Sequence, residues 1–383
     1  MKNFLEKTID FIKKFVRKKQ FQIIAFSILL AFVVETLRRV LVHFPEFVER
    51  YYSMGFYRFL SQTMSILFGM FPFSVAEALI ASLIIFSIYY LVRSIKRKRM
   101  LNFIAFAVCT VCVLYSSFFV FWGFNWSRVS TQDYLGLEIG PSHIDELRAL
   151  SNEIADRINQ IRPLLQEDKN GVMRINSSDW NLRNRAQLGF DNLARELDSE
   201  RFWGIYSPPK NLISSRLFSY FRVVGIFIPY TFEANINRLD PDVSRPFTIM
   251  HEIAHQQGIA PEDEANFIAF LACRAHPDID FIYSGYYMAF IYTMNELHIH
   301  DREEYDRIRE RMYEGFRRDV IARYEFWEHF RNRRIFNINI GEIAGNIGEA
   351  VNDAYLQSQG VDDGIRSYSR MVSLLLAERR ART

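Results

Sequence analysis

Residues 245–273 read RPFTIMHEIAHQQGIAPEDEANFIAFLAC, and this stretch decides the expected fold of the chain. It contains two largely apolar segments separated by a short turn. Pro246 suits the first turn of a helix and Gly258 suits a helix exit, so we expect helices at 246–257 and 262–275. The apolar run FTIM in the first helix indicates that this helix is buried rather than solvated.

The pentapeptide HEIAH at 251–255 places two histidines four positions apart. Such side chains project from one helical face, so the imidazoles of His251 and His255 can reach a single Zn²⁺. Glu252 lies beside the first ligand and can serve as general base for a zinc-activated water. The alternative is a surface helix with two solvated histidines, but on a buried face these polar groups need partners, which a metal supplies.

The second helix offers two candidates for a third metal ligand, Glu262 and Glu264. They lie two positions apart and project in different directions, so both cannot face one metal. We favour Glu262, because Asn266 follows it by four positions on the same face and can support a ligand histidine through a hydrogen bond. Glu264 then complements the positive end of the helix dipole.

HEIAH followed by the E-x-x-A-N pattern of Glu262 to Asn266 resembles the gluzincin peptidases. Among these are the membrane-bound CAAX-processing and heat-shock proteases and the peptidases that cleave phage-type repressors. In those families the Glu of the second motif is the third zinc ligand, so the resemblance implies that role for Glu262. The gap between the two motifs is much shorter here than in the CAAX-processing type, so no substrate is carried over.

A second resemblance covers nearly the whole chain. It rests on HFPEFVERYYSMGFYRF, FGMFPFSVAE, GIFIPYTFEANIN, the stretch 245–273, and NDAYLQSQG with SYSRMV. These segments are similar to an uncharacterised bacterial membrane-protein family, a domain of unknown function with a zincin-like core. The resemblance implies a three-span anchor and a metallopeptidase-like domain, without an established substrate.

The N-terminal third of the chain contains three long apolar runs, at about 21–43, 71–92 and 101–122. A helix needs about 20 apolar residues to cross a bilayer. The second and third runs meet this length directly, and the first meets it only when its apolar core is extended to residue 43. We therefore expect a membrane domain over 21–125 with three transmembrane helices and the lipid bilayer as a partner.

Charge divides the chain in the same way. Residues 1–125 carry 16 Lys/Arg and 6 Asp/Glu, a net +10, whereas residues 126–383 carry 31 and 38, a net −7. The positive excess lies in clusters at 13–19 and 93–99 that flank expected spans, and it indicates cytoplasmic flanks rather than nucleic-acid binding. We expect 1–20 to be a basic cytoplasmic segment of a multi-pass cell-membrane protein whose C-terminal domain is extracytoplasmic.

Two further regions leave alternatives open. Residues 45–70 are rich in aromatics and predict either an interfacial segment or a helix packed on the soluble domain. Gly171–Asn176 and Arg222–Pro229 are the best strand candidates. The segment 225–237 is expected either to be an edge strand that binds extended substrate or to be an ordinary core strand.

The expected fold class is mainly α (α+β). N-terminal transmembrane helices precede a mostly helical zincin-like domain, 126–383, with a small β-sheet. Beyond the two helices of the metal motif, further helices are expected at 278–297, 302–330, 340–358 and 362–379.

Hydrolysis of a peptide bond also needs a donor to the developing oxyanion. The candidates are Tyr286, Tyr355, Tyr368 and Arg370, and the last two lead because they lie in the SYSRM segment of the family resemblance. The alternative for both is helix packing and surface charge.

Together these patterns predict a membrane-anchored zinc metallopeptidase that acts on a peptide or protein substrate of unknown identity. Its metal ligands are His251, His255 and Glu262, and Glu252 is its general base. One alternative is a zinc-binding membrane sensor or docking protein without proteolytic activity. Another is a structural membrane protein in which HEIAH is incidental.

Overall fold

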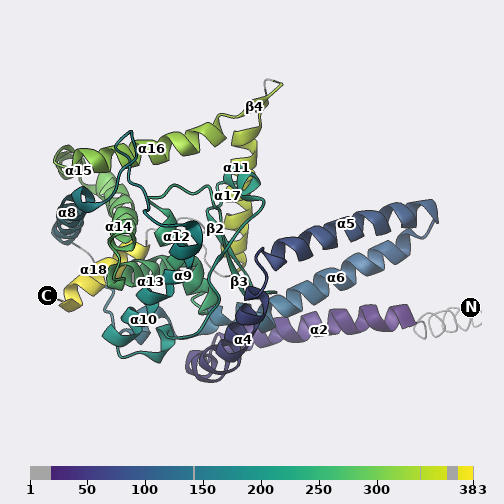
Figure 1. Cartoon of the computed structure of the whole chain (residues 1–383). Coiled ribbons are helices and arrows are strands. Elements are labelled where there is room, and N and C mark those ends of the chain that lie inside the picture. Colours follow the sequence, from purple (N-terminus) through teal and green to yellow (C-terminus); the bar gives the residue numbers. More distant parts are fainter. Residues whose placement is uncertain (1–18, 141–142, 337, 360–369, 383) are drawn as a thin grey trace, which may run out of the picture.

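The computed structural model describes residues 19–140, 143–336, 338–359 and 370–382. Figure 1 shows a body of helices around a small sheet, from one edge of which three long helices project side by side. The chain is mainly helical with its few strands in small sheets, as the sequence predicts. The expected cytoplasmic segment lies almost entirely outside the described residues.

The projecting helices are α2 (Lys19–Leu41), α5 (Val75–Lys96) and α6 (Met100–Phe121). By length and composition, α5 and α6 could cross a membrane, in agreement with the second and third expected spans. Helix α5 begins at residue 75 because the Ser74 side chain accepts a hydrogen bond from Glu77 N at 3.2 Å. Helix α2 packs along α6, and a first membrane span through α2 stays a prediction.

The segment between α2 and α5 is helical and packs on the body. It consists of α3 (Pro45–Phe47), the π-helix η1 (Val48–Tyr57) and α4 (Arg58–Gly69). One face of η1 and α4 is buried, and the buried positions recur every four residues, at Ser53, Tyr57, Ser61 and Ser65. This face corresponds to the packed-helix alternative for residues 45–70. The opposite face is exposed and aromatic.

The sheet of the body has three short strands in the order β1-β3-β2. Strand β1 (Lys210–Asn211) runs parallel to the central strand β3 (Glu233–Ile236), and β2 (Gly225–Ile228) pairs with β3 in the antiparallel direction. Strand β2 is therefore an edge strand, and it lies within the predicted strand Arg222–Pro229. A separate hairpin joins β4 (Arg334–Ile335) and β5 (Ile338–Asn339).

The other predicted strand, Gly171–Asn176, is wrong: this segment contributes only an isolated bridge between Glu167 and Met173. Side chains take the backbone donors that a strand partner would need. Met173 N donates to Asp319 at 2.7 Å and Ile175 N donates to Asp242 at 3.1 Å. Carboxylates from distant elements therefore replace a neighbouring strand here.

The body is built around α12 (Arg245–Gln256), α13 (Glu262–Ala275) and α14 (Ile279–His300), which pack on one another. The remaining helices surround them: α7 (Thr131–Tyr134), α8 (Ile144–Ile161), α9 (Asp179–Arg185), α10 (Gln187–Glu196), α11 (Ser215–Tyr220), α15 (Arg302–Glu310), α16 (Glu314–Arg331), α17 (Ile340–Ser358) and α18 (Arg370–Arg382), with the short 3₁₀ helices η2 (Gly123–Ser127), η3 (Arg162–Leu164) and η4 (Glu200–Phe202).

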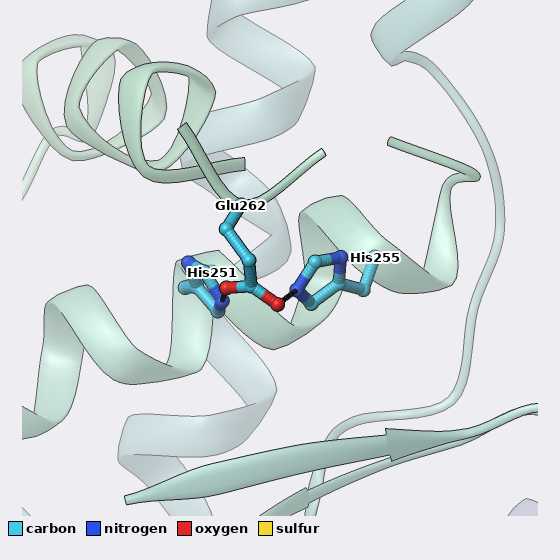
Figure 2. Close-up of side chains that lie close together, drawn as sticks. All are labelled: His251, His255 and Glu262. Atoms are coloured by element: carbon cyan, nitrogen blue, oxygen red, sulfur yellow. Dashed lines mark ion pairs between the residues drawn. The ribbon is translucent and has the colours of Figure 1, made fainter. Parts of the chain in front are cut away.

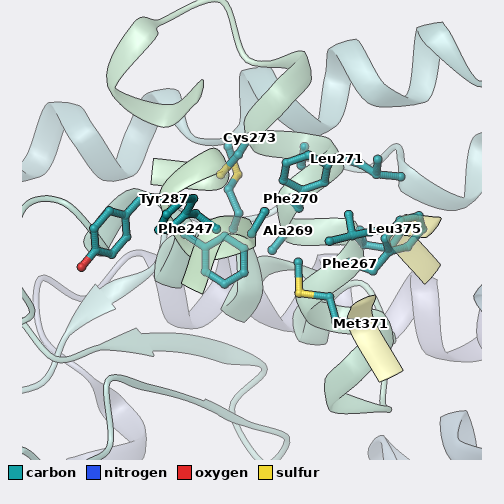
Figure 3. Packing of buried hydrophobic residues seen from close by; sticks show 14 of the residues in the cluster. Phe247, Phe267, Ala269, Phe270, Leu271, Cys273, Tyr287, Met371 and Leu375 are labelled. Carbon is teal, nitrogen blue, oxygen red and sulfur yellow. The ribbon is translucent and has the colours of Figure 1, made fainter. Parts of the chain in front are cut away.

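Apolar packing centres on α13. Figure 3 shows its side chains between Phe247 of α12, Tyr287 of α14 and Leu375 of α18. The predicted helices 246–257 and 262–275 agree with α12 and α13 to within one residue. The single helix predicted at 302–330 is wrong, because the chain turns at 311–313 and divides it into α15 and α16.

A buried ion pair joins the sheet to the projecting helices. Glu233 of β3 is fully buried and accepts bonds from Lys210 Nζ at 2.5 Å, from Ala76 N at 2.7 Å and from Val75 N at 3.1 Å. The carboxylate thus binds the first amides of α5, where the helix dipole favours negative charge. Glu77 adds a second connection by accepting Ile213 N at 2.7 Å. The body and α5 are therefore joined through polar contacts.

Candidate metal centre

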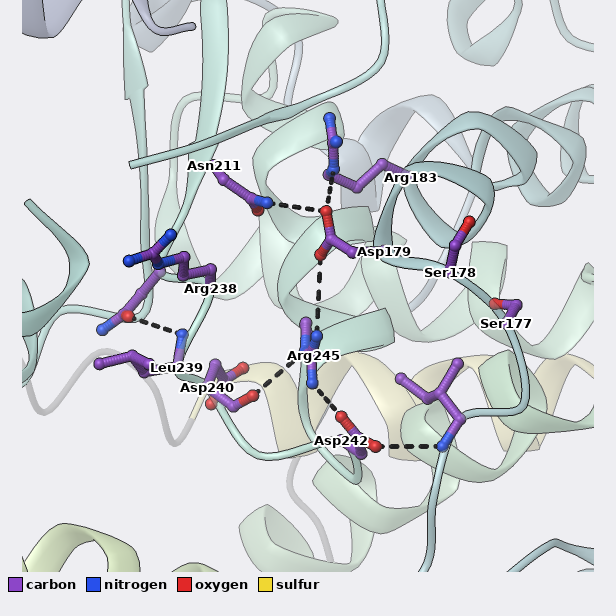
Figure 4. A network of polar contacts seen from close by, with 12 residues as sticks. Ser177, Ser178, Asp179, Arg183, Asn211, Arg238, Leu239, Asp240, Asp242 and Arg245 are labelled. Carbon is purple, nitrogen blue, oxygen red and sulfur yellow. Dashed lines mark hydrogen bonds and ion pairs between the residues drawn. The ribbon is translucent and has the colours of Figure 1, made fainter. Parts of the chain in front are cut away.

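The start of α12 is held by a network of carboxylates (Figure 4). Asp179 of α9 accepts a hydrogen bond from Asn211 of β1 at 2.7 Å and lies 3.7 Å from the guanidinium of Arg245. Arg245 also pairs with Asp242, and its Nε donates to the carbonyl of Asp240. Pro246 follows in the first turn, where a missing amide proton has no cost. The start of the helix is thus tied to both the sheet and α9.

Three side chains of the HEIAH motif and the next helix converge on one point. His251 Nε2 lies 3.2 Å from one oxygen of Glu262, and His255 Nε2 lies 3.4 Å from the other. Figure 2 shows the carboxylate of Glu262 between the two rings. One ligand atom from each residue lies within 4.8 Å of the others. Donor atoms at these separations can surround a single cation.

The two imidazole rings differ in whether Nδ1 has a hydrogen-bond partner among the described residues. His255 Nδ1 lies 2.7 Å from the carbonyl oxygen of Ile259, which favours a proton on Nδ1 and leaves Nε2 available as a ligand. His251 Nδ1 and the Nδ2 atom of Asn266 are both buried without a hydrogen-bond partner in the described part of the chain. The expected hydrogen bond from Asn266 to a ligand histidine is therefore not formed, although Asn266 is buried near the motif.

The three groups are electrostatically coupled. Burial alone would lower the pKa of His255, but the carboxylate of Glu262 outweighs burial and raises this pKa to about 9. Burial would raise the pKa of Glu262, but His255 and His251 hold it well below its usual range. A cation bound between them would take the place of the proton, so metal binding would release protons.

Glu252 projects from α12 toward the edge strand. Burial raises the pKa of Glu252 to about 7. One oxygen accepts the backbone amide of Phe227, and Oε2 has no hydrogen-bond partner among the described residues. A Cβ atom at Gly225 would lie 2.4 Å from Glu252 Oε1, so only glycine leaves room for this carboxylate. Sequence reasoning missed this role, although a glycine inside a strand pattern indicates close approach of another group.

The rival ligand Glu264 has other partners. Its carboxylate accepts hydrogen bonds from Thr131 N at 3.0 Å and from Thr131 Oγ1 at 2.5 Å. Glu262, two residues earlier, is the acid that faces the histidines. This agrees with the preference for Glu262 and with the prediction that both acids cannot face one point. Glu264 instead connects α13 to α7.

The proposed oxyanion donors lie in different places. Tyr368 is outside the described residues, and Arg370 lies at the exposed start of α18. Tyr286 packs edge-on against Phe270, with ring centroids 5.4 Å apart. Burial, with a smaller effect of the charge on Glu262, raises the pKa of Tyr355. The hydroxyl of Tyr355 therefore lies close enough to the carboxylate of Glu262 for that charge to contribute to its pKa.

A family model described as a protein of unknown function (DUF3810) matches residues 52–376 of the chain. The chain belongs to the DUF3810 family. This confirms the predicted resemblance to a domain of unknown function. No curated protein and no solved structure matches the chain.

The DUF3810 match begins inside η1, so it includes residues that bind the C-terminal end of α12, the helix that carries His251 and His255. Tyr57 OH donates to the carbonyl of Gln256 at 2.9 Å, and Ser61 Oγ donates to the same carbonyl at 2.8 Å. Trp122 Nε1 donates to the carbonyl of His255 at 3.1 Å. These side chains satisfy carbonyls that have no partner within α12. Sequence reasoning missed them, because each lies 133 or more positions from the carbonyl that it binds.

The turn after α12 depends on the same contacts. Gly258 has a φ of +85°, a conformation that favours glycine, and a Cβ there would lie 2.8 Å from the ring of Tyr57. Arg128 donates to the carbonyl of Gly258 at 3.0 Å and forms an ion pair with Glu49 of η1 at 2.7 Å. The η1 segment and Arg128 therefore support α12 at its last turn.

Proposed function

We propose that the protein is a membrane-anchored zinc metallopeptidase. The observation that carries this proposal is the convergence of His251, His255 and Glu262 from two consecutive helices, with Glu252 beside them. Two imidazole nitrogens and one carboxylate oxygen make up the donor set of many catalytic zinc sites, which keep a fourth position for water or substrate. The gluzincin resemblance of the sequence supports the same assignment.

The residues present fit a zinc ion. Ile259 orients one ligand ring through its carbonyl oxygen, and the side chains of the cluster are at most 15% exposed, which excludes most competing solvent. When bound, Zn²⁺ would polarise the scissile carbonyl and lower the pKa of the attacking water. Without a cation, two buried rings around one carboxylate would have to hold an additional proton.

Glu252 is positioned for proton transfer. It lies next to the first ligand in sequence, on the side of α12 that faces β2, and one of its oxygens has no hydrogen-bond partner among the described residues. It can take a proton from the attacking water and return it to the leaving amine. A structural zinc site needs no carboxylate at this position.

Strand β2 provides a place for an extended substrate. Asn237 N bonds to Val224 O across the β2–β3 pair, so the alternation of the ladder turns the backbone of Gly225 toward the free edge. An extended peptide can add to such an edge as a further strand. For the oxyanion, Tyr355 is a candidate from α17, and Tyr368 and Arg370 remain candidates from the SYSRM segment.

Metal content of the purified full-length protein tests the ligand assignment. We expect zinc in the wild type, loss of zinc in Glu262→Gln and retention of zinc in Glu264→Gln. The second variant is a matched control, because Glu264 lies on the same helix but binds Thr131. Equal zinc content in both variants would contradict the assignment, and a metal-free wild type would favour a structural role for HEIAH.

Comparison of wild-type cells with cells that carry Glu252→Gln tests the chemistry. We expect the variant to keep its zinc and to lose hydrolysis, so that uncleaved substrate accumulates and becomes visible by proteomics. Retained zinc without accumulation of any protein would instead favour the zinc-binding sensor or docking protein.

A further inference from the structure

The outer face of η1 and α4 is a large exposed apolar surface. Between Tyr51 and Phe73 the sequence has a single charged residue, Arg58, whose side chain is mostly buried and lies 3.8 Å from Glu200. Phe59 is 71% exposed. Other large apolar side chains of these two helices and of the residues directly beside them are also exposed: Phe47, Tyr51, Phe56, Ile66, Leu67 and Met70. A surface of this kind on a folded protein indicates a binding partner.

Two loops of the body extend this surface. Trp203 and Ile205 are exposed and lie against α4, where Arg58 donates to the carbonyl of Trp203 at 3.2 Å and Ile205 N donates to Gln62 at 2.9 Å. Ile213 is also exposed, and it lies beside the start of α5 because its amide donates a hydrogen bond to Glu77. Three separate parts of the chain thus present apolar side chains near the bases of the projecting helices.

The position of this surface identifies its partner as lipid. The η1–α4 segment begins a few residues after α2 and ends a few residues before α5, one of the two helices that could cross a membrane. Figure 1 shows α4 at the base of the projecting helices, where they meet the body. Aromatic side chains are enriched at the boundary between lipid headgroups and acyl chains, and amphipathic helices lie in that plane.

We infer that the outer face of η1 and α4, with Trp203, Ile205 and Ile213, lies in the headgroup region of the bilayer. The inner face of the same helices binds the end of the metal helix through Tyr57 and Ser61. The segment therefore connects the bilayer surface directly to the metal site. If the proposed peptidase function holds, the substrates are peptide segments that adjoin a membrane anchor.

Site-specific fluorescence of the full-length protein in lipid nanodiscs tests this contact. Cys109 and Cys112 are replaced by alanine, and Cys273 stays because it is fully buried. An environment-sensitive fluorophore is then attached at Phe59→Cys, at Ile205→Cys or at the control Ile321→Cys. Residue 321 is 55% exposed on α16, which Figure 1 shows at the opposite edge of the body from α4.

Lipids that carry a nitroxide at headgroup depth serve as the quencher. We expect the labels at 59 and 205 to show blue-shifted emission and to lose most of it to the quencher lipid, while the label at 321 keeps its emission. Labels at 59 and 205 that behave like the one at 321 would overturn the inference. The inference would also be overturned if the label at 59 is quenched only by a label on a second copy of the chain, since that result assigns the surface to a protein interface.

Two features keep the test decisive. The position 205 label comes from a different chain segment, so it answers the question if Phe59→Cys fails to reach the near-ultraviolet circular dichroism of the parent. The measurement uses neither metal nor activity, so its result is independent of the proposed peptidase function. If only proteins that lack a membrane anchor accumulate in cells with Glu252→Gln, the inferred substrate class is wrong, but the inferred lipid contact is unaffected.

Discussion

Helices α13 and α5 are both apolar, but their side chains are buried in opposite ways. In α13 the nine consecutive residues from Ala265 to Cys273 are all buried. In α5 only Ala76 and Ser94 are buried, and isoleucines of the central turns face outward. Figure 3 shows protein packed around α13, whereas Figure 1 shows α5 outside the body.

This difference shows that helices with similarly apolar sequences can have different surroundings. An apolar run requires that a helix stay away from water, but it does not determine what replaces the water. Around α13 the replacement is other side chains of the chain itself. Around α5 the chain supplies almost none, so the exposed apolar surface fits a lipid environment. The cluster of His251, His255 and Glu262 lies in the body, where side chains of the chain itself cover it.

The largest effect is expected from one substitution made in both helices. Ile268 of α13 is fully buried and Ile85 of α5 is 68% exposed. We expect Ile268→Ala to lower the free energy of unfolding of the body by about 2–5 kcal/mol, because a cavity remains. We expect Ile85→Ala to leave it unchanged. Denaturant unfolding in detergent micelles, followed by circular dichroism, measures both, and equal losses would mean that α5 packs against protein.

A smaller effect is expected from placing a charge at the centre of α5. Ile85→Lys should disfavour membrane insertion by about 3 kcal/mol, because the ammonium group loses its hydration in the hydrocarbon layer. The fraction of protein that resists alkaline extraction from membranes reports this change. Ile321→Lys on α16 is the matched control and should change nothing. Full integration of Ile85→Lys would argue against a lipid-facing α5.

The sequence predicted the features that depend on short separations along the chain. The spacing of His251 and His255 fixes a common helical face, and the two-residue offset between Glu262 and Glu264 means that only one of the two acids can face the histidines. The same local rules predicted α12, α13, α5 and α6. The convergence of the His251, His255 and Glu262 side chains therefore agrees with reasoning that used fewer than 20 consecutive residues.

Features that depend on distant contacts were not predictable in this way. Tyr57 binds a carbonyl 199 positions away, and Gly225 makes room for Glu252 across the gap between a strand and a helix. The false strand at 171–176 has the same origin, because Asp319 and Asp242 take its backbone donors. The two alternatives for residues 45–70 also could not be separated from the sequence, since the carbonyls that Tyr57 and Ser61 bind lie 199 and 195 positions away.

The smallest effect is expected at Tyr57 of η1, where this segment contacts the end of α12. Tyr57→Phe removes one buried hydrogen bond to Gln256 O, which keeps its bond from Ser61. We expect a loss of about 0.5–1.5 kcal/mol in stability. Zinc affinity should fall by up to about tenfold, because the last turn that carries His255 becomes less well fixed. Thermal unfolding and competition with a chelator measure these two quantities.

A double-mutant cycle tests whether Tyr57 and Ser61 act as one support for the metal helix. Because both donate to the same carbonyl, Tyr57→Phe combined with Ser61→Ala should weaken zinc binding by more than the product of the single effects. Tyr324→Phe, at an exposed position on α16, should be silent. If the single and double variants bind zinc as tightly as the wild type, Tyr57 and Ser61 only pack against α12. The η1–α4 segment would then have no influence on the proposed metal site.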